Sequence, residues 1–374
     1  MVRHSPVEWQ APAVVPGFPV FSILGQIVGG VMNIPVILGD IAKPDPVTPE
    51  AIYGEWDRDQ ITWLFRALDA LSEHQFTILS NHDTLLHDLQ KLKGKVDVVF
   101  NLCDAGFNNT FSQELHIPAL CEMMGFPYTG ANPRCLAFCF DKAIMSSIAQ
   151  HLDIPVPEAM LLPPDKDRLD WPFTFPVIVK PNQGHGSIGI TFENFAVDAE
   201  ALAKSIGFLH KTIGREQYLL VQEFLPGIEI DVGIVGNTET EMTVLPILAK
   251  DFSTIGESFP PIASYELKWL SGFPEYSSRP VDFPAETEKR IRDWSRELFS
   301  RLGCRDYARM EWRMDRRGNP KLIDVNPNPD WSAQGILVEM AGYAGISYPE
   351  LLRTILLTAE KRLQLGSQNR SGKS

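Results

Sequence analysis

Residues 307–326 constrain the fold most, because apolar side chains recur at every second position over 307–314. This pattern is typical of a β-strand that buries one face. The apolar face holds Ala308, Met310, Trp312 and Met314, and the other face holds Tyr307, Arg309, Glu311 and Arg313. Gly318 and Asn319 then supply a turn, and residues 322–326 can return as a paired strand. The segment therefore predicts an antiparallel hairpin.

Three oxygen-bearing side chains of this hairpin converge if the polar faces of its two strands align. They are Glu311 on the first strand and Asp324 and Asn326 on the second. Two carboxylates and a carboxamide form a hard donor set, suited to Mg²⁺ held together with substrate phosphates. An ordinary solvated face of an edge hairpin has the same pattern, so that alternative stays open at this point.

Strands and helices alternate in the first third of the chain. Three short apolar runs, 36–38, 76–79 and 96–100, are typical of strands. Residues 60–71 carry apolar side chains at three- and four-residue spacing, which predicts an amphipathic helix. Together these segments indicate an open α/β sheet. At the other end, residues 348–365 predict a final helix, and the polar residues 366–374 predict a disordered tail.

Charge and cysteine content exclude several classes of protein. The net charge is −13, which argues against binding to nucleic acid by general electrostatics. The five cysteines show no CxxC spacing, so we expect buried thiols and a reducing, cytoplasmic location. Residues 14–38 contain no charged side chain, but proline and glycine divide them into runs too short for a spanning helix. No membrane role is therefore predicted.

A strand ending in Lys180 runs into a glycine-rich loop with Gly184, Gly186 and Gly189 around Ser187. Glycines allow backbone N–H groups to approach phosphate oxygens, and a nearby lysine adds a positive charge. A plain flexible hairpin tip is the alternative. Further on, an apolar strand reaches residues 222–225 and bends before Glu229, an arrangement that can hold a planar base with Glu229 free for a ribose hydroxyl.

Taken in order, these elements resemble the ATP-grasp superfamily and, within it, the D-alanine–D-alanine ligase group. The matching motifs are residues 125–130 with Asp141 and Lys142, 176–181 with 186–189, 222–227 with Glu229, 265–268, 308–311 and 324–326. The resemblance implies an α/β (α+β) ATP-grasp fold with three domains. We expect an N-terminal open parallel α/β sheet domain (1–140), a central lid domain (141–222) and a C-terminal catalytic domain with an antiparallel sheet (223–365).

The resemblance also implies roles for individual residues. ATP would be bound by Lys142, Lys180, Gly186, Ser187, Gly189, Gln222, Glu223, Phe224, Leu225, Glu229 and Lys268. One or two Mg²⁺ ions, replaceable by Mn²⁺, would be bound by Glu311, Asp324 and Asn326. Lys268 would reach the phosphates from a mobile loop, and Arg309 would stabilise the negative charge that develops during the reaction. These two are the expected catalytic residues.

The resemblance implies an activity: ATP-dependent joining of a small carboxylate and an amine through an acyl phosphate. Homodimers are common among such ligases.

The part of the family pattern that binds the amino-acid substrates is altered here. Residues 103–116 replace a short loop that carries a histidine, and no glutamate follows Gly29 and Gly30. The second substrate would meet Asp330, where a glycine is expected, and Gly335 and Ile336, where a Ser-Leu pair is expected.

We therefore expect a ligase acting on an amino acid or a small specialised metabolite. A genuine D-alanine–D-alanine ligase of cell-wall synthesis is the alternative within the class. A kinase or carboxylase on the same fold, or an ATP-binding module without catalytic activity, are alternatives of other classes.

Overall fold

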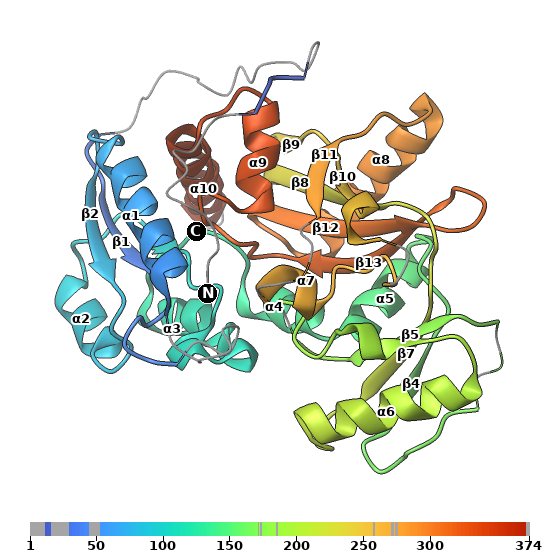
Figure 1. The fold of residues 1–374 in the computed structure, drawn as a ribbon. Helices are drawn as coiled ribbons and strands as arrows, with labels where there is room; N and C mark the ends of the chain where they lie inside the picture. The colour runs from blue at the N-terminus through green and yellow to red at the C-terminus, as the bar shows by residue number, and fades with distance from the viewer. Residues whose placement is uncertain are drawn as a thin grey trace.

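The computed structural model describes residues 12–15, 30–44, 53–170, 172, 174–184, 186–256, 259–270, 273 and 276–371, except for the side chains of 365–371 (Figure 1). The described chain forms three β-sheets, one after another along the sequence, with helices packed on each. This arrangement confirms the predicted fold class.

The N-terminal sheet is parallel, with strand order β2-β1-β3. Its strands are β1 (Asn33–Ile37), β2 (Gln75–Leu79) and β3 (Phe100–Asn101), and its helices are α1 (Glu55–Asp69), α2 (Leu85–Leu92) and α3 (His116–Met124). The third strand is shorter than the predicted run 96–100. Ahead of it, the Asp97 carboxylate accepts a hydrogen bond from the Asn33 backbone N–H, at 2.7 Å, so a side chain replaces part of the ladder.

The central sheet is antiparallel, with order β4-β7-β5-β6, and helix α6 packs against it. Its elements are β4 (Ala159–Leu162), β5 (Val177–Pro181), β6 (Phe195–Ala196), α6 (Ala199–Ile213) and β7 (Leu219–Glu223). Val177 and Val179 of β5 and Leu202 and Ile206 of α6 share one small core. This sheet carries the glycine-rich loop directly after β5.

The C-terminal sheet is antiparallel, with order β11-β10-β8-β12-β13, and β9 pairs with β8. Its strands are β8 (Glu229–Gly236), β9 (Met242–Val244), β10 (Leu248–Asp251), β11 (Ser277–Pro280), β12 (Asp306–Met314) and β13 (Pro320–Asn326). The helices of this half are α4 (Pro133–Phe140), α5 (Lys142–His151), α7 (Tyr265–Trp269), α8 (Ala285–Leu302), α9 (Ile336–Tyr343) and α10 (Tyr348–Ser371). Short 3-10 turns occupy Phe107–Asn109, Phe111–Gln113, Phe192–Asn194 and Ser253–Ile255.

Two cores lie on opposite faces of this sheet. The predicted apolar face of β12, with Met310 and Trp312 fully buried, packs into a core that also contains Met145 and Ala149 of α5. Helix α5 therefore packs with the C-terminal sheet, although its residues fall within the predicted range 141–222. The second core joins the N-terminal sheet to α9 and α10, so these two regions share one hydrophobic interior.

Three further expectations meet the structure here. The cysteines are all buried and free, as predicted. Helix α10 begins at Tyr348 as expected but continues to Ser371, past the predicted end at 365. A single glycine inside a helix costs only about 1 kcal/mol, so Gly366 does not end it. Residues 372–374 of the predicted tail, and residues 16–29 of the uncharged stretch, lie outside the described residues.

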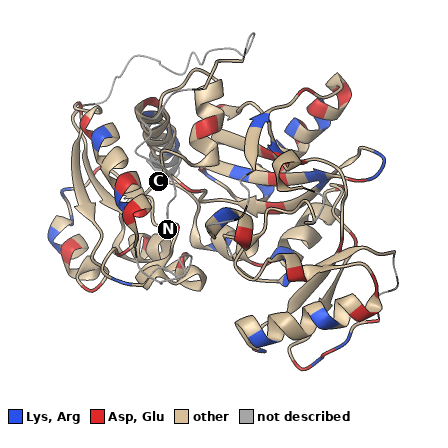
Figure 2. Cartoon of the chain, viewed as in Figure 1, with Lys and Arg blue, Asp and Glu red and all other residues tan. Residues whose placement is uncertain are grey.

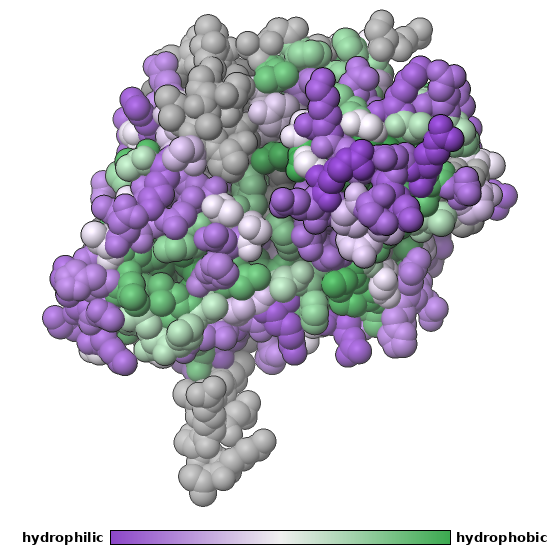
Figure 3. Space-filling model, turned by 90° about the horizontal axis from the view of Figure 1, so that it is seen from below, coloured by the Kyte–Doolittle hydropathy of each residue, from purple (hydrophilic) through white to green (hydrophobic). Residues whose placement is uncertain are grey.

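Within the described part of the chain, no helix combines the length and apolar character required to cross a membrane. Some apolar side chains are nevertheless exposed at the surface seen in Figure 3. Leu86 on α2 is 52% exposed and Met123 on α3 is 85% exposed.

Candidate active site

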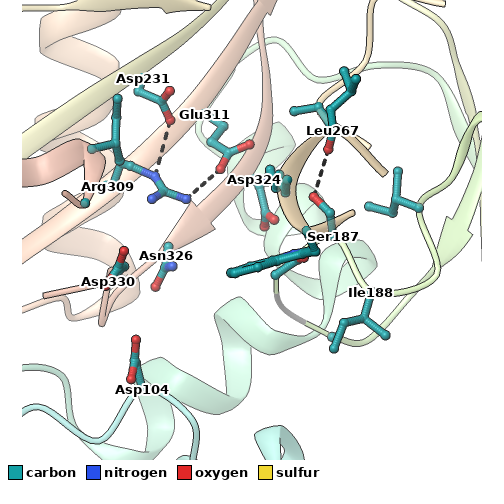
Figure 4. A pocket seen from close by; sticks show the side chains of 18 of the residues that line it. Asp104, Ser187, Ile188, Asp231, Leu267, Arg309, Glu311, Asp324, Asn326 and Asp330 are labelled. Atoms are coloured by element: carbon teal, nitrogen blue, oxygen red, sulfur yellow. Dashed lines mark hydrogen bonds and ion pairs between the residues drawn. The ribbon is translucent and has the colours of Figure 1, made fainter. Parts of the chain in front are cut away.

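A cavity of about 790 Å³ lies where the three sheets meet (Figure 4). Residues from the N-terminal sheet region, the central sheet and the C-terminal sheet all line it. Cavities at such junctions are common ligand sites, because several rigid elements can each supply side chains. The predicted site residues can therefore be judged by whether they reach this cavity.

All but one of the predicted site residues line the cavity. They are Lys142, Lys180, Gly186, Ser187, Gln222, Glu223, Phe224, Leu225, Glu229, Lys268, Arg309, Glu311, Asp324, Asn326, Asp330, Gly335 and Ile336. Gly189 is the exception, and it shapes the loop instead. Its φ is +73°, and a Cβ there would lie 2.8 Å from Cγ of Pro181, so this position requires glycine.

The hairpin of β12 and β13 has the register that brings its polar faces together. Glu311 lies opposite Asp324, and Arg309 lies opposite Asn326, with an irregularity after Glu311. The oxygen-bearing side chains predicted to converge are thus neighbours on one wall of the cavity (Figure 4).

Two buried lysines stand beside the glycine-rich loop. Lys142, the first residue of α5, donates a hydrogen bond to the Gly184 carbonyl, at 2.8 Å, and its Nζ lies 3.8 Å from Oδ2 of Asp324. Burial, together with the positive charge of Lys142, lowers the pKa of Lys180 to about 8. Two adjacent cations are suited to binding an anion between them.

Hydrogen bonds join the glycine-rich loop to the segment around α7. Ser187 Oγ donates to the Ala263 carbonyl at 2.9 Å, and Trp269 Nε1 donates to the Gly186 carbonyl at 2.9 Å. Lys268 lies on this helix and lines the cavity, and burial lowers its pKa. The loop of the central sheet and the helix of the C-terminal region thus cover the same end of the cavity.

The predicted base-binding segment begins in the last residues of β7 and continues past its end. Gln222 and Leu225 are buried, and the guanidinium carbon of Arg313 lies 4.8 Å from the centre of the Phe224 ring. The Glu223 carboxylate is bound to Lys321 and accepts a hydrogen bond from the Glu158 backbone N–H. The Glu223 side chain is therefore held by the protein itself, which orients the strand end.

The floor of the cavity is a charged face, of which Glu229, Arg309 and Glu311 were predicted from the sequence, whereas Lys250 and Asp231 were missed. Lys250 of β10 lies 2.6 Å from Glu229 and 3.4 Å from Glu311, and Arg313 lies 2.8 Å from Glu229. Asp231 of β8 lies 3.3 Å from Arg309. Three carboxylates and three cations thus alternate on neighbouring strands. The run 248–251 alone gives no signal for Lys250, because only the pairing of β10 with β8 brings it here.

These contacts set the charge states of the site. Burial opposes ionisation of Glu311, but Lys250 and Arg309 outweigh it and hold the pKa of Glu311 well below its usual range. Burial likewise opposes the charge of Arg309, but Glu311 and Asp231 outweigh it and raise the pKa of Arg309. The pKa of Asp231 is raised, chiefly by burial. Both Glu311 and Arg309 are therefore charged at neutral pH.

Comparison with known proteins agrees with this architecture. The family model described as "D-ala D-ala ligase C-terminus" matches residues 149–357, more than half of the chain. An uncharacterized protein, y4sG of Sinorhizobium fredii, is 31% identical over 265 residues, covering 71% of this chain and 75% of that protein. A D-alanine–D-alanine ligase of Pelotomaculum thermopropionicum is 27% identical over 286 residues, covering 74% and 81%.

A solved structure has the same fold. The D-alanine–D-alanine ligase of Bacillus anthracis, in complex with ATP, superposes with a TM-score of 0.66 at 21% identity, covering 91% of this chain and 100% of that one. The family model and the relatives together establish the class: the chain belongs to the D-alanine–D-alanine ligase family of ATP-dependent ligases, built on the ATP-grasp fold.

Proposed function

We propose that the protein forms an amide bond between a small carboxylate and an amine other than D-alanine, through an acyl phosphate. The observation that carries the second half of this proposal is the packing at Gly335. A Cβ at this position would lie 3.0 Å from Oδ2 of Asp330 and 3.0 Å from the Ser332 carbonyl oxygen. The resemblance leads one to expect a serine at position 335, but a serine side chain has little room there. The Asp330 carboxylate lies in the adjacent space.

The nucleotide end supports ATP binding. Lys142, Lys180 and Lys268 supply positive charge for the phosphates, and the loop around Ser187 lies over them. Gln222 and Leu225 would bind the adenine, and Glu229 the ribose. Each Glu229 oxygen already accepts one hydrogen bond, from Lys250 or from Arg313, and a carboxylate oxygen can accept another from a ribose hydroxyl.

The oxygens of Glu311, Asp324 and Asn326 fit Mg²⁺, which prefers carboxylate and amide oxygen donors. Within the described ranges, no group of three or more His, Cys, Asp and Glu side chains is arranged as a metal site. A Mg²⁺ site here would therefore combine two carboxylates, one carboxamide and the phosphates themselves. When bound, the ion would neutralise charge on the transferring phosphoryl group.

The proposed reaction has two steps, phosphoryl transfer and then attack by the amine. A carboxylate oxygen of the first substrate attacks the γ-phosphorus, the bond to the β-phosphate oxygen breaks, and ADP leaves. The neutral amine nitrogen then attacks the acyl carbon, the carbon–oxygen bond to phosphate breaks, and phosphate leaves with the proton that the nitrogen loses. Arg309, whose charge is secured by Glu311 and Asp231, stabilises the oxyanion that forms between these events.

Phosphate release by the purified protein with ATP and Mg²⁺ tests this proposal, with pairs of carboxylates and amines as substrates and mass spectrometry of the products. We expect an amide and one phosphate for each ADP. A dipeptide formed efficiently from D-alanine alone would overturn the proposed substrate. Undiminished turnover after Glu311→Ala combined with Asn326→Ala would contradict the metal-binding role.

A further inference from the structure

The cavity has an acidic end opposite the nucleotide end. Its described lining from the N-terminal region and from residues 330–339 contains no lysine or arginine. It contains five carboxylic acids: Asp57, Asp104, Glu114, Asp330 and Glu339. Figure 4 shows Asp104 reaching toward Asp330 from the opposite side of the cavity. In Figure 2, α9 is uncharged apart from one acidic band, which corresponds to Glu339. The field at this end therefore favours a cation.

One buried oxygen atom at this end accepts no hydrogen bond from the described residues. Gln60 of α1 is 2% exposed, and its Nε2 donates to Gln334 Oε1 at 3.3 Å, but its own Oε1 has no partner. An unsatisfied buried acceptor is costly, so Gln60 favours a ligand that donates an N–H group.

Aromatic side chains form part of the same wall. Trp56 of α1 is fixed by a hydrogen bond from its Nε1 to Gln334 Oε1, at 2.8 Å, and Tyr53 and Trp331 also line this part of the cavity. Ammonium groups are attracted to aromatic faces as well as to carboxylates. The carboxylates, the unpaired oxygen of Gln60 and the aromatic rings thus all favour the same kind of ligand.

An acceptor bearing its own carboxylate is disfavoured. Arg309, which lines the same cavity as Asp330, is already paired with Asp231 and Glu311. The Asp330 carboxylate is held in place by the backbone N–H and the hydroxyl of Ser332, both at 2.8 Å. A carboxylate of an amino acid would meet fixed negative charge here without a free counter-charge.

We propose that the acceptor substrate is a diamine, with one neutral nitrogen that attacks the acyl phosphate and a second, protonated nitrogen held by Asp330 and Glu339. Asp330 precedes α9 and Glu339 lies in its first turn, and both residues line this end of the cavity, so both can contact one ligand. Burial, followed by the charge of Asp231, raises the pKa of Glu339 to about 7, so a neighbouring ammonium favours its ionised form. This inference rests on the proposed ligase function.

The test compares three amines in the ATP-dependent assay with a fixed panel of carboxylates: 1,4-diaminobutane, n-butylamine and D-alanine. Amide products are identified by mass spectrometry. We expect kcat/KM for the diamine to exceed that for n-butylamine by at least tenfold. In the double variant Asp330→Asn with Glu339→Gln, this ratio should fall at least tenfold.

The matched control is Glu239→Gln with Glu241→Gln, which removes two exposed carboxylates from the β8–β9 turn and should preserve the ratio. ADP titration verifies that each variant is folded, and the two single variants replace the double one if it fails to bind ADP. If amide forms but kcat/KM for n-butylamine or D-alanine equals or exceeds that for the diamine, this inference is overturned and the ligase function stands. Binding of ADP without any amide product would overturn the ligase function itself, and this inference with it.

Discussion

The Nζ atom of Lys250 lies 2.6 Å from Oε1 of Glu229, on the neighbouring strand, and both side chains are buried. The same ammonium also lies near Asp231 and Glu311. The three carboxylates therefore depend on one lysine for part of their compensation. Burial disfavours the charge of Lys250, but the carboxylates of Asp231, Glu229 and Glu311 outweigh it and raise the pKa of Lys250, so it remains charged.

We expect Lys250→Met to lower the free energy of unfolding by about 3–5 kcal/mol, because it leaves buried carboxylates without their counter-charge. Urea denaturation monitored by circular dichroism measures this loss. Lys289→Met, which removes a 70% exposed lysine paired with Asp293, should leave the free energy of unfolding nearly unchanged. Equal losses in the two variants would contradict the role given to Lys250.

The pKa of Lys180, lowered to about 8 by burial and by Lys142, predicts the pH dependence of nucleotide binding. Bound phosphate favours the charged lysine and raises its pKa. ADP affinity should therefore be constant below pH 8 and fall as the pH rises above it, because the free protein then loses the proton that binding requires. Calorimetric titration between pH 6.5 and 9.5 measures this, and Lys180→Arg should remove the fall. Affinity that rises with pH would refute the assignment.

Arg362 of α10 holds the buried Asp306 carboxylate through two nitrogens, at 3.0 and 2.8 Å, and also donates to the Tyr128 carbonyl at 2.8 Å. Arg362→Met should destabilise the fold by about 3–5 kcal/mol, since it leaves Asp306 buried with only neutral partners. Arg296→Met on the exposed side of α8 is the comparison, with an expected change below about 1 kcal/mol. Thermal unfolding of the two variants separates these outcomes.

Restoring the serine expected at position 335 should not by itself create a D-alanine ligase. A Cβ at Gly335 meets the Asp330 carboxylate and two backbone carbonyls, so Gly335→Ser should lower amide formation with the natural type of acceptor. Adding Asp330→Gly removes both the side-chain contact and the negative charge. We expect measurable use of D-alanine only in the double variant, with dipeptide formation as the measurement. Efficient use by Gly335→Ser alone would contradict the role of Asp330.

Residue patterns alone predicted a convergence of side chains only within one continuous segment, and the joining of Lys142 and Lys268 to that segment was expected from the family resemblance. The alternation of residues 307–314 and the spacing of Asp324 and Asn326 were sufficient to predict the hairpin and its polar face. Lys250 could not be predicted, because it reaches Glu311 only through the pairing of β10 with β8 and of β8 with β12. Gln60 and Glu339 were missed for the same reason. Gln60 lies on the amphipathic helix α1, and Glu339 is the only charged residue of the apolar helix α9, so the docking of each helix decides whether the residue faces the cavity.

The hydrogen bonds of Ser187 and Trp269 have a kinetic consequence. They connect the loop after β5 to helix α7 across the nucleotide end, and we expect ADP to leave only after both contacts break. The acidic end is bridged as well, by hydrogen bonds from Trp56 and Gln60 of α1 to Gln334. We therefore expect the opening of these contacts, rather than bond formation, to limit the turnover rate, and a more viscous solvent to slow the reaction.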